Sequence, residues 1–296
     1  MTRILIADGY PAESVARTRE RGGRTSADDI FPEVLARHAS DLDCTTLSVA
    51  EGERLPQGVI LDDFDGIAIT GSPLSAYETD EPRVARQISF ARDAFESGVP
   101  VWGSCWGMQV AAAALGGTVR LNPRGYEIGI GRAITLSEEG RRHLLYRDKG
   151  PSFDAVTVHH DEVERMPADA VLLASNTMSR VQAMAVDRDG MSFWGVQYHP
   201  EFDLAHVAFL MAGRPQRLVA EGLARDEGDV AVLTSDFAAL GHDPSRRDLA
   251  WRYGIGADVL DADLRTREFR NWLAAKVAPR RAARAAARAP DRTHTS

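Results

Sequence analysis

The stretch that decides the fold is Val99-Pro100-Val101-Trp102-Gly103-Ser104-Cys105-Trp106-Gly107-Met108. It begins with an apolar run typical of a short strand (99–102) and leads into an alanine-rich, helix-favouring segment (108–115). A Gly-x-Cys-x-Gly pattern in that setting is typical of a nucleophile elbow, a bend too tight for side chains at the flanking positions. The bend would present Cys105 at the mouth of a sheet and at the positive end of a helix, which favours the thiolate form. The alternative is a buried structural cysteine in a glycine-rich turn.

Strand and helix patterns alternate before this bend. Strands are predicted over 3–7, 44–49 and 64–70, and helical segments within 11–40 and 81–97. This alternation predicts parallel strands joined by crossover helices. After residue 118 the pattern changes to short strands separated by turn residues, over 128–136, 155–159, 170–174, 182–187 and 193–198.

The predicted fold class is therefore α/β. We expect a doubly wound, flavodoxin-like, mostly parallel sheet with an added antiparallel hairpin region, followed by a C-terminal helical extension. The expected divisions are a main domain over 1–202, the extension over 203–278, and a disordered basic tail over 279–296, which is rich in Ala and Arg.

Composition excludes several classes of protein. The chain has 296 residues, is 44% hydrophobic, and carries a net charge of −8, which fits a soluble globular protein and argues against a nucleic-acid binder. No apolar run approaches the ~18 residues needed to cross a membrane, and the start of the chain lacks the features of a signal peptide. Two cysteines, Cys44 and Cys105, cannot form a disulfide framework, so a cytoplasmic, reducing location is expected.

A second motif, Gly195-Val196-Gln197-Tyr198-His199-Pro200-Glu201, stands at the end of an apolar strand, and its His199 lies 94 residues beyond Cys105. A thiolate nucleophile needs a base and proton carrier, and histidine titrates in the right range. That histidine needs an acceptor to orient it, and Glu201 lies two residues further on. Taken alone, His-Pro-Glu is a common turn; the pairing with the cysteine bend is what indicates a nucleophilic enzyme.

Together the two motifs resemble those of the class I (triad-type) glutamine amidotransferases, over roughly residues 1–210. The chain is most similar to stand-alone members that are like the amidotransferase domain of GMP synthetase. The resemblance implies that Cys105 is the nucleophile, His199 the general base and acid, and Glu201 the orienting carboxylate. It implies no metal and no organic cofactor.

Further positions match the family's substrate site. By this resemblance the Gly71-Ser72 loop supplies an oxyanion N–H, as the backbone of Trp106 would, and Gln109 helps to hold the substrate. Two positions depart from the family pattern, since Ser72 and His160 each replace a glycine. The substrate-binding residues expected from the resemblance are Gly71, Ser72, Trp106, Gln109, His159, His160 and Asp161. His159 and His160 have a second interpretation, as a strand end with one ring buried and the other exposed.

Three functions follow as alternatives. The first is hydrolysis of the glutamine side-chain amide, with ammonia released for a separate acceptor enzyme, because the 94 residues after Phe202 are too few for a synthetase domain. The second is hydrolysis or peptidase action on other γ-glutamyl amides. The third is a non-catalytic regulatory module that keeps the fold. The expected partners are glutamine or another γ-glutamyl compound and a separate ammonia-accepting synthetase, and the oligomeric state is left open.

Overall fold

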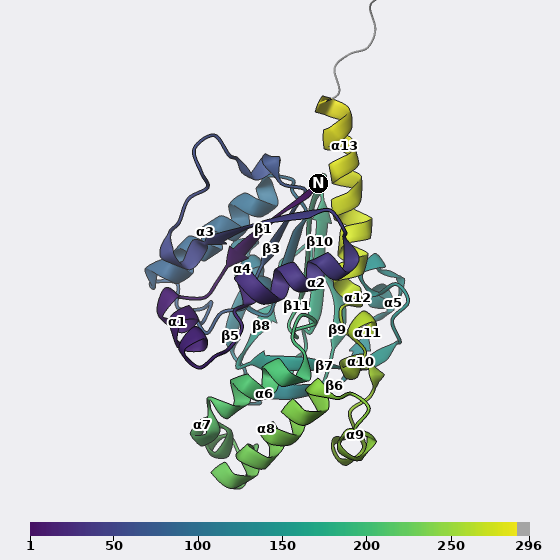
Figure 1. Cartoon of the computed structure of the whole chain (residues 1–296). Coiled ribbons are helices and arrows are strands. Elements are labelled where there is room, and N and C mark those ends of the chain that lie inside the picture. The colour runs from purple at the N-terminus through teal and green to yellow at the C-terminus, as the bar shows by residue number, and fades with distance from the viewer. Residues whose placement is uncertain (289–296) are drawn as a thin grey trace, which may run out of the picture.

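The structure, a computed structural model, describes residues 1–288. Within these residues a nine-stranded mixed sheet runs through the centre of the molecule with helices on both faces (Figure 1). The strand order is β2-β1-β3-β4-β11-β10-β9-β6-β7, and β5 and β8 form a separate two-stranded sheet. The strands are β1 (Thr2–Asp8), β2 (Leu42–Ser48), β3 (Gly66–Ile69), β4 (Val101–Ser104), β5 (Thr118–Leu121), β6 (Glu127–Leu136), β7 (Ser152–His159), β8 (Asp161–Arg165), β9 (Val171–Ser175), β10 (Ala183–Arg188) and β11 (Met191–Val196).

Helices separate and follow these strands. They are α1 (Ala12–Glu20), α2 (Phe31–His38), α3 (Pro82–Glu96), α4 (Trp106–Ala114), α5 (Glu138–Arg142), α6 (Leu204–Ala212), α7 (Pro215–Ala220), α8 (Glu227–His242), α9 (Arg247–Tyr253), α10 (Ala257–Leu260), α11 (Ala262–Arg265), α12 (Arg267–Trp272) and α13 (Ala278–Arg288). No helix in the described part of the chain is both long and apolar enough to cross a membrane.

The central strands are buried on both faces, which is why the sheet is wound on both sides. In β1, Ile4 and Ile6 belong to one apolar core, which α2 and α12 cover, whereas Leu5 and Ala7 belong to the core under α3 and α4. Successive strand residues point to opposite faces, so an uninterrupted apolar run supplies both cores at once. The predicted doubly wound α/β class is confirmed.

The two halves of the sheet differ in strand direction. β2, β1, β3, β4 and β11 pair in parallel, and the pairs from β11 through β10, β9, β6 and β7 are antiparallel. The expected antiparallel hairpin region is therefore present. The small sheet of β5 and β8 was not predicted.

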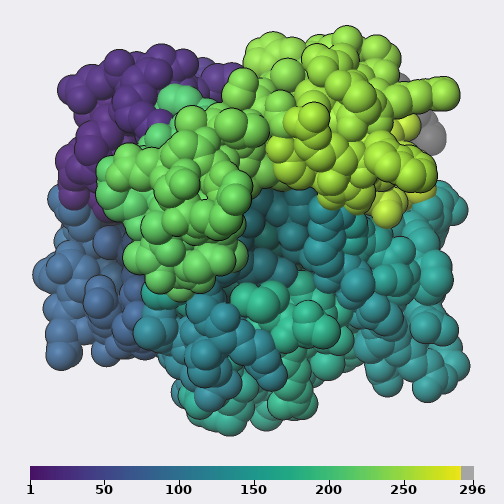
Figure 2. All heavy atoms as spheres, turned by 90° about the horizontal axis from the view of Figure 1, so that it is seen from below, coloured from purple at the N-terminus to yellow at the C-terminus, as the bar shows by residue number. Residues whose placement is uncertain are grey.

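The C-terminal region is helical, as predicted. In Figure 1, α6, α7 and α8 lie below the sheet, and α12 and α13 run back along it. Seen from below (Figure 2), the extension covers much of this face and meets the purple N-terminal segment. Buried hydrogen bonds hold the extension to the main domain. Glu268 of α12 accepts one from Lys149 and one from the hydroxyl of Tyr198 (2.6 Å), the residue that precedes His199.

The prediction of a disordered tail is wrong for residues 279–288, which belong to helix α13. The physical reason is charge pairing with the main domain, which composition alone does not reveal. Arg280 pairs with Asp62 (2.6 Å), Arg281 with Asp41 (2.8 Å) and Arg284 with the buried Asp65 (2.5 Å). The rest of the predicted tail, 289–296, lies outside the described residues.

Candidate active site

Cys105 occupies a strained bend between β4 and α4. Its backbone has φ 51° and ψ −102°, a region that residues with a side chain rarely adopt. Its N–H donates a hydrogen bond to the Val196 carbonyl on the parallel neighbour β11 (2.7 Å), and Ser104 pairs in register with Val196. Because parallel strands end at the same edge, the residues that follow β11 arrive beside Cys105. Strand pairing thus brings His199 to the cysteine bend.

The two glycines that flank the bend have no room for a side chain. A Cβ on Gly103 would lie 2.6 Å from the carbonyl carbon of Gly107, and one on Gly107 would lie 2.5 Å from the Ile69 oxygen. Both contacts are with backbone atoms, which cannot move away as the end of a flexible side chain can. The steric explanation proposed for the Gly-x-Cys-x-Gly pattern is confirmed.

A methyl group at Gly107 should therefore disturb the bend. We expect Gly107→Ala to lower the free energy of unfolding by about 1–3 kcal/mol, because the helix must move away from β3. Urea denaturation measures the change. The matched control is Gly256→Ala, where a Cβ meets nothing within 4 Å; it should change stability by less than about 0.5 kcal/mol. Equal stability of the two variants would contradict the steric argument.

His199 is held by a chain of buried hydrogen bonds. Its Nδ1 lies 2.7 Å from Oε1 of Glu201, and the other carboxylate oxygen accepts from the Ser104 hydroxyl (3.0 Å). The Ser104 oxygen in turn accepts from the Trp102 indole N–H (2.9 Å). The His199 ring also stacks on Phe202, with centroids 4.2 Å apart and planes 6° apart. Glu201 and Phe202 together therefore fix the position and tilt of the imidazole.

The surroundings of His199 favour its charged form. Burial lowers the pKa of His199, but the Glu201 carboxylate and then the Cys105 sulfur outweigh this and raise the pKa to about 10. The Cys105 sulfur also receives a hydrogen bond from the Gln197 amide (3.4 Å) and donates toward the Val158 carbonyl (3.7 Å). The arrangement places the His199 imidazolium beside the nucleophilic sulfur.

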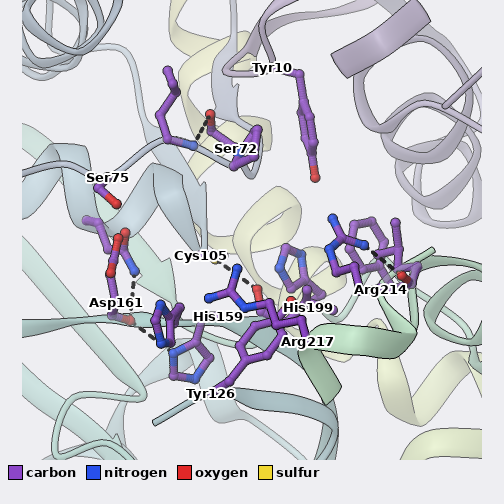
Figure 3. A pocket seen from close by; sticks show the side chains of 17 residues that line it. Tyr10, Ser72, Ser75, Cys105, Tyr126, His159, Asp161, His199, Arg214 and Arg217 are labelled. Atoms are coloured by element: carbon purple, nitrogen blue, oxygen red, sulfur yellow. Dashed lines mark hydrogen bonds between the residues drawn. The ribbon is translucent and has the colours of Figure 1, made fainter. Parts of the chain in front are cut away.

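A cavity of about 170 Å³ opens above Cys105 and His199 (Figure 3). The structure brings most of the predicted substrate-binding residues to its wall. Gln109 donates through its amide nitrogen to the Asp161 carbonyl and to the Gln197 side chain (both 3.1 Å), so it is fixed in place. The predicted residues that line the cavity with Cys105 and His199 are Ser72, Gln109, His159, His160 and Asp161.

Gly71 and Trp106 do not line the cavity but adjoin it. A Cβ on Gly71 would lie 3.1 Å from Cε1 of His199. Trp106 is the first residue of α4, so its N–H has no acceptor within the helix, while its buried indole donates to Gln87 (2.6 Å). Ser72 is not among the described residues with positive φ, so serine fits where the family pattern has glycine.

The two neighbouring histidines have different environments. His159 is buried, with Nε2 2.7 Å from Glu127 and Nδ1 3.0 Å from the Asp161 carbonyl. His160 is half-buried, packs edge-on against Tyr126, and has Nε2 3.4 Å from Glu221 of the extension. One ring is therefore buried, as that interpretation expects, but the other is half-buried and not exposed. The side chain that replaces the family's glycine here contacts the helical extension.

Sequence reasoning missed one whole wall of the cavity. Tyr10 comes from the loop after β1, Tyr126 precedes β6, and Leu210, Arg214 and Arg217 come from the helical extension. No local motif marks these positions, because residues far apart in the sequence meet here only in the folded protein. Leu210, Arg214 and Arg217 reach the cavity through the packing of α6 and α7. Among residues 1–288 no group of three His, Cys, Asp or Glu side chains is arranged to hold a metal ion.

An α/β sheet with a cysteine, a histidine and a glutamate gathered at one edge defines the class of molecule, a hydrolytic enzyme. The sequence profile named glutamine amidotransferase class-I matches residues 27–207. The chain belongs to the class-I glutamine amidotransferase family.

Known proteins resemble the chain to different extents. It is 33% identical to a γ-glutamyl-L-1-hydroxyisopropylamide hydrolase of a Pseudomonas species, over 94% of both chains. It is 37% identical to the glutamine-hydrolysing GMP synthase of Nitrosomonas eutropha over 141 residues, which are 46% of this chain and 25% of the synthase. It therefore spans about the full length of the hydrolase but a quarter of the synthase.

Solved structures share the fold. A glutamine amidotransferase from Thermotoga maritima superposes with a TM-score of 0.59 at 16% identity and covers 93% of this chain and 98% of its own. One from Methylobacillus flagellatus has a TM-score of 0.59 at 20% identity, with complete coverage of both chains. At these identities the likeness concerns the fold alone.

Proposed function

We propose that the protein hydrolyses γ-glutamyl amides through a γ-glutamyl thioester on Cys105. Glutamine is the simplest such amide, so the reaction expected from the sequence is included. The observation that carries the proposal is the meeting of Cys105 with the His199–Glu201 pair at the floor of a cavity. The full-length similarity to a γ-glutamyl amide hydrolase supports it.

In the first half-reaction the Cys105 thiolate attacks the γ-carbonyl carbon of the substrate. The resulting oxyanion accepts hydrogen bonds from the N–H of Trp106 and from the Gly71-Ser72 loop. The imidazolium of His199 gives its proton to the amide nitrogen, the C–N bond breaks, and the amine leaves. A γ-glutamyl thioester remains on the sulfur.

In the second half-reaction the now neutral His199 takes a proton from water. The hydroxide oxygen adds to the thioester carbonyl, the C–S bond breaks, and glutamate leaves. The sulfur departs as thiolate beside the newly formed imidazolium, which restores the starting state. Glu201 stays ionised throughout and keeps the ring oriented.

The polar end of the cavity suits the amino-acid head of the γ-glutamyl group. Burial raises the pKa of the Asp161 carboxyl, and the adjacent Ser75 hydroxyl and His160 oppose the rise. A carboxylate in such a place gains by pairing with an ammonium group, which the glutamyl head provides. We propose Asp161, with Gln109, Ser72, His159 and His160, as the site for this head.

A second candidate is supply of ammonia from glutamine to a separate synthetase, favoured by the similarity to part of GMP synthases. The two candidates share the chemistry and differ in what leaves Cys105. We also propose that residues 1–202 form the enzyme domain with 203–278 as its helical extension. A cytoplasmic location is proposed from the two free thiols, Cys44 and Cys105.

Trapping with hydroxylamine tests the proposed thioester. Incubation with a γ-glutamyl amide and hydroxylamine should give γ-glutamyl hydroxamate at the expense of glutamate, with the rate of amine release unchanged or increased, because hydroxylamine attacks the thioester faster than water does. Isoglutamine, with its amide on the α-carboxyl, is the matched control and should not react. Absence of both glutamate and hydroxamate with every γ-glutamyl amide tried would refute the proposal.

A further inference from the structure

The cavity has two unlike ends, on either side of Cys105. In Figure 3, Ser75 and Asp161 lie on one side of the cysteine, and His199 and Arg214 lie on the other, beneath the ring of Tyr10. The first end is the polar one proposed above for the amino-acid head. Two further cavity residues belong to the second end, because Phe202 stacks on the His199 ring and the Leu210 carbonyl accepts a hydrogen bond from Arg214. This second end, which we call the amine end, has no assigned function.

The chemistry places the leaving amine at the amine end. In the proposed mechanism His199 protonates the departing nitrogen, so whatever is attached to that nitrogen lies on the His199 side of the sulfur. The Tyr10 hydroxyl reaches the same point, since a Cβ on Gly71 would lie 3.1 Å from His199 Cε1 and 3.4 Å from that hydroxyl. A substituent on the nitrogen would therefore extend between Tyr10 and Arg214.

Arg214 brings an uncompensated positive charge to this place. Its side chain is half-buried and donates one hydrogen bond, from Nη1 to the Leu210 carbonyl (2.7 Å). None of the ion pairs found within 4.0 Å among residues 1–288 involves its guanidinium, whereas the neighbouring Arg217 has one. By contrast, Arg217 packs over the Tyr126 ring (4.4 Å) and has Glu221 at 3.9 Å. Of the two arginines that line the cavity, Arg214 is therefore the one without an ion-pairing carboxylate among residues 1–288.

We propose that Arg214 binds a carboxylate carried by the leaving amine, so that the preferred substrates are γ-glutamyl derivatives of amino acids. This inference rests on the proposed function and specifies its substrate class. A guanidinium presents parallel N–H donors that match the two oxygens of a carboxylate. Tyr10 and Leu210 would cover the apolar part of the amine.

Three substrates with one carbon skeleton test this directly. They are γ-glutamyl-L-alanine, γ-glutamyl-L-alaninol and γ-glutamyl isopropylamide, in which the same carbon bears a carboxylate, a hydroxymethyl or a methyl group. We expect kcat/KM to fall in that order, with at least about 10-fold between the first and the last. Equal values for the three, with glutamate still released, would overturn this inference and leave the proposed function standing.

Variants of Arg214 identify the group responsible. Arg214→Met should lower kcat/KM for the alanine derivative about 10- to 100-fold and change it less than about 3-fold for the isopropylamide. Arg214→Lys should keep part of the preference, because the charge remains without the fork. Arg225→Met is the matched control, since Arg225 lies on the same extension with an 86% exposed side chain.

Two other outcomes would overturn either this inference or the proposed function. An equal loss on all three substrates would show that Arg214 binds the carboxylate of the glutamyl head, or only supports the fold, and would overturn the inference. Alkylation of Cys105 by a glutamine-analogue electrophile at the wild-type rate would establish that the variant site is intact. Hydrolysis of none of the γ-glutamyl amides by the wild-type protein would instead overturn the proposed function itself.

Discussion

Hydrolysis of γ-glutamyl amides by the Cys105→Ala variant is expected to fall by about four to six orders of magnitude. The methyl group of alanine cannot attack a carbonyl, and no thioester can form. The oxyanion donors and the substrate cavity remain, so the residual rate should be that of a bound amide attacked by water. Release of glutamate from a labelled γ-glutamyl amide measures the loss.

The second cysteine provides a control within the same chain. Cys44 lies in β2, where burial and then the charge of Asp43 raise the pKa of its thiol to about 11. It therefore stays protonated near pH 7 and is a poor nucleophile. Cys44→Ala should keep activity within about 2-fold, since β2 lies at the edge of the sheet, three strands away from β4.

Labelling separates loss of chemistry from loss of structure. A glutamine-analogue electrophile should modify wild type and Cys44→Ala once per chain and should leave Cys105→Ala unmodified. Thermal unfolding of Cys105→Ala should stay cooperative, although alanine still has to adopt φ 51° at this bend. Turnover by a folded Cys105→Ala protein above about 1% of wild type would exclude this cysteine as the nucleophile.

The features that sequence predicted well are those in which local residues determine local structure. The run Ile4-Leu5-Ile6-Ala7 has apolar residues for both faces of a sheet, so a buried parallel strand was the natural interpretation. The cysteine bend was predictable because Gly103 and Gly107 are required by backbone contacts within a few residues and with the adjacent strand. The meeting of Cys105 with His199 followed from two motifs that both end strands.

The features that sequence missed depend on which surfaces meet after folding. Arg214 has no neighbouring motif, and only the packing of α6 and α7 brings it to the cavity. The sequence of the Arg-rich end predicts a solvated tail, because its partners, Asp41, Asp62 and Asp65, lie more than 200 residues away. Such long-range charge pairs have no sequence period that a reader could recognise.

The second large effect is expected for Glu201→Gln, with a loss in kcat/KM of about 10²–10⁴-fold near pH 7. Glutamine is nearly the same size, so the change acts through charge and hydrogen-bond direction. The Trp102 indole donates to the Ser104 hydroxyl, which therefore donates onward to the residue at 201. The amide oxygen of glutamine must face Ser104, which turns its NH₂ toward Nδ1 of His199. The ring is then held neutral with its proton on Nε2, where it cannot accept one from the thiol.

The pH profile should change in a direction set by the pKa of His199. In wild type that pKa is raised to about 10, because the charges of Glu201 and Cys105 outweigh burial, so kcat/KM should hold through pH 9 and fall as His199 loses its proton above that. In Glu201→Gln the main raising charge is absent while burial still lowers the pKa of His199, so the fall should begin at a lower pH than in wild type. The free energy of unfolding of the wild-type protein should also decrease as the pH rises. The His199 charge contributes fully below about pH 6.5 in wild type, and its contribution disappears as the pH rises through about 10.

Glu164→Gln is the matched control for this change, because Glu164 is 47% exposed and pairs with Arg120 at the surface. Its kcat/KM and pH profile should coincide with those of wild type. An unshifted alkaline limb in Glu201→Gln, with the protein folded, would mean that Glu201 does not control the charge of His199. The imidazole would then owe its orientation to the stacked ring of Phe202. The charge of His199 in the first half-reaction would have to be stabilised by a group other than Glu201.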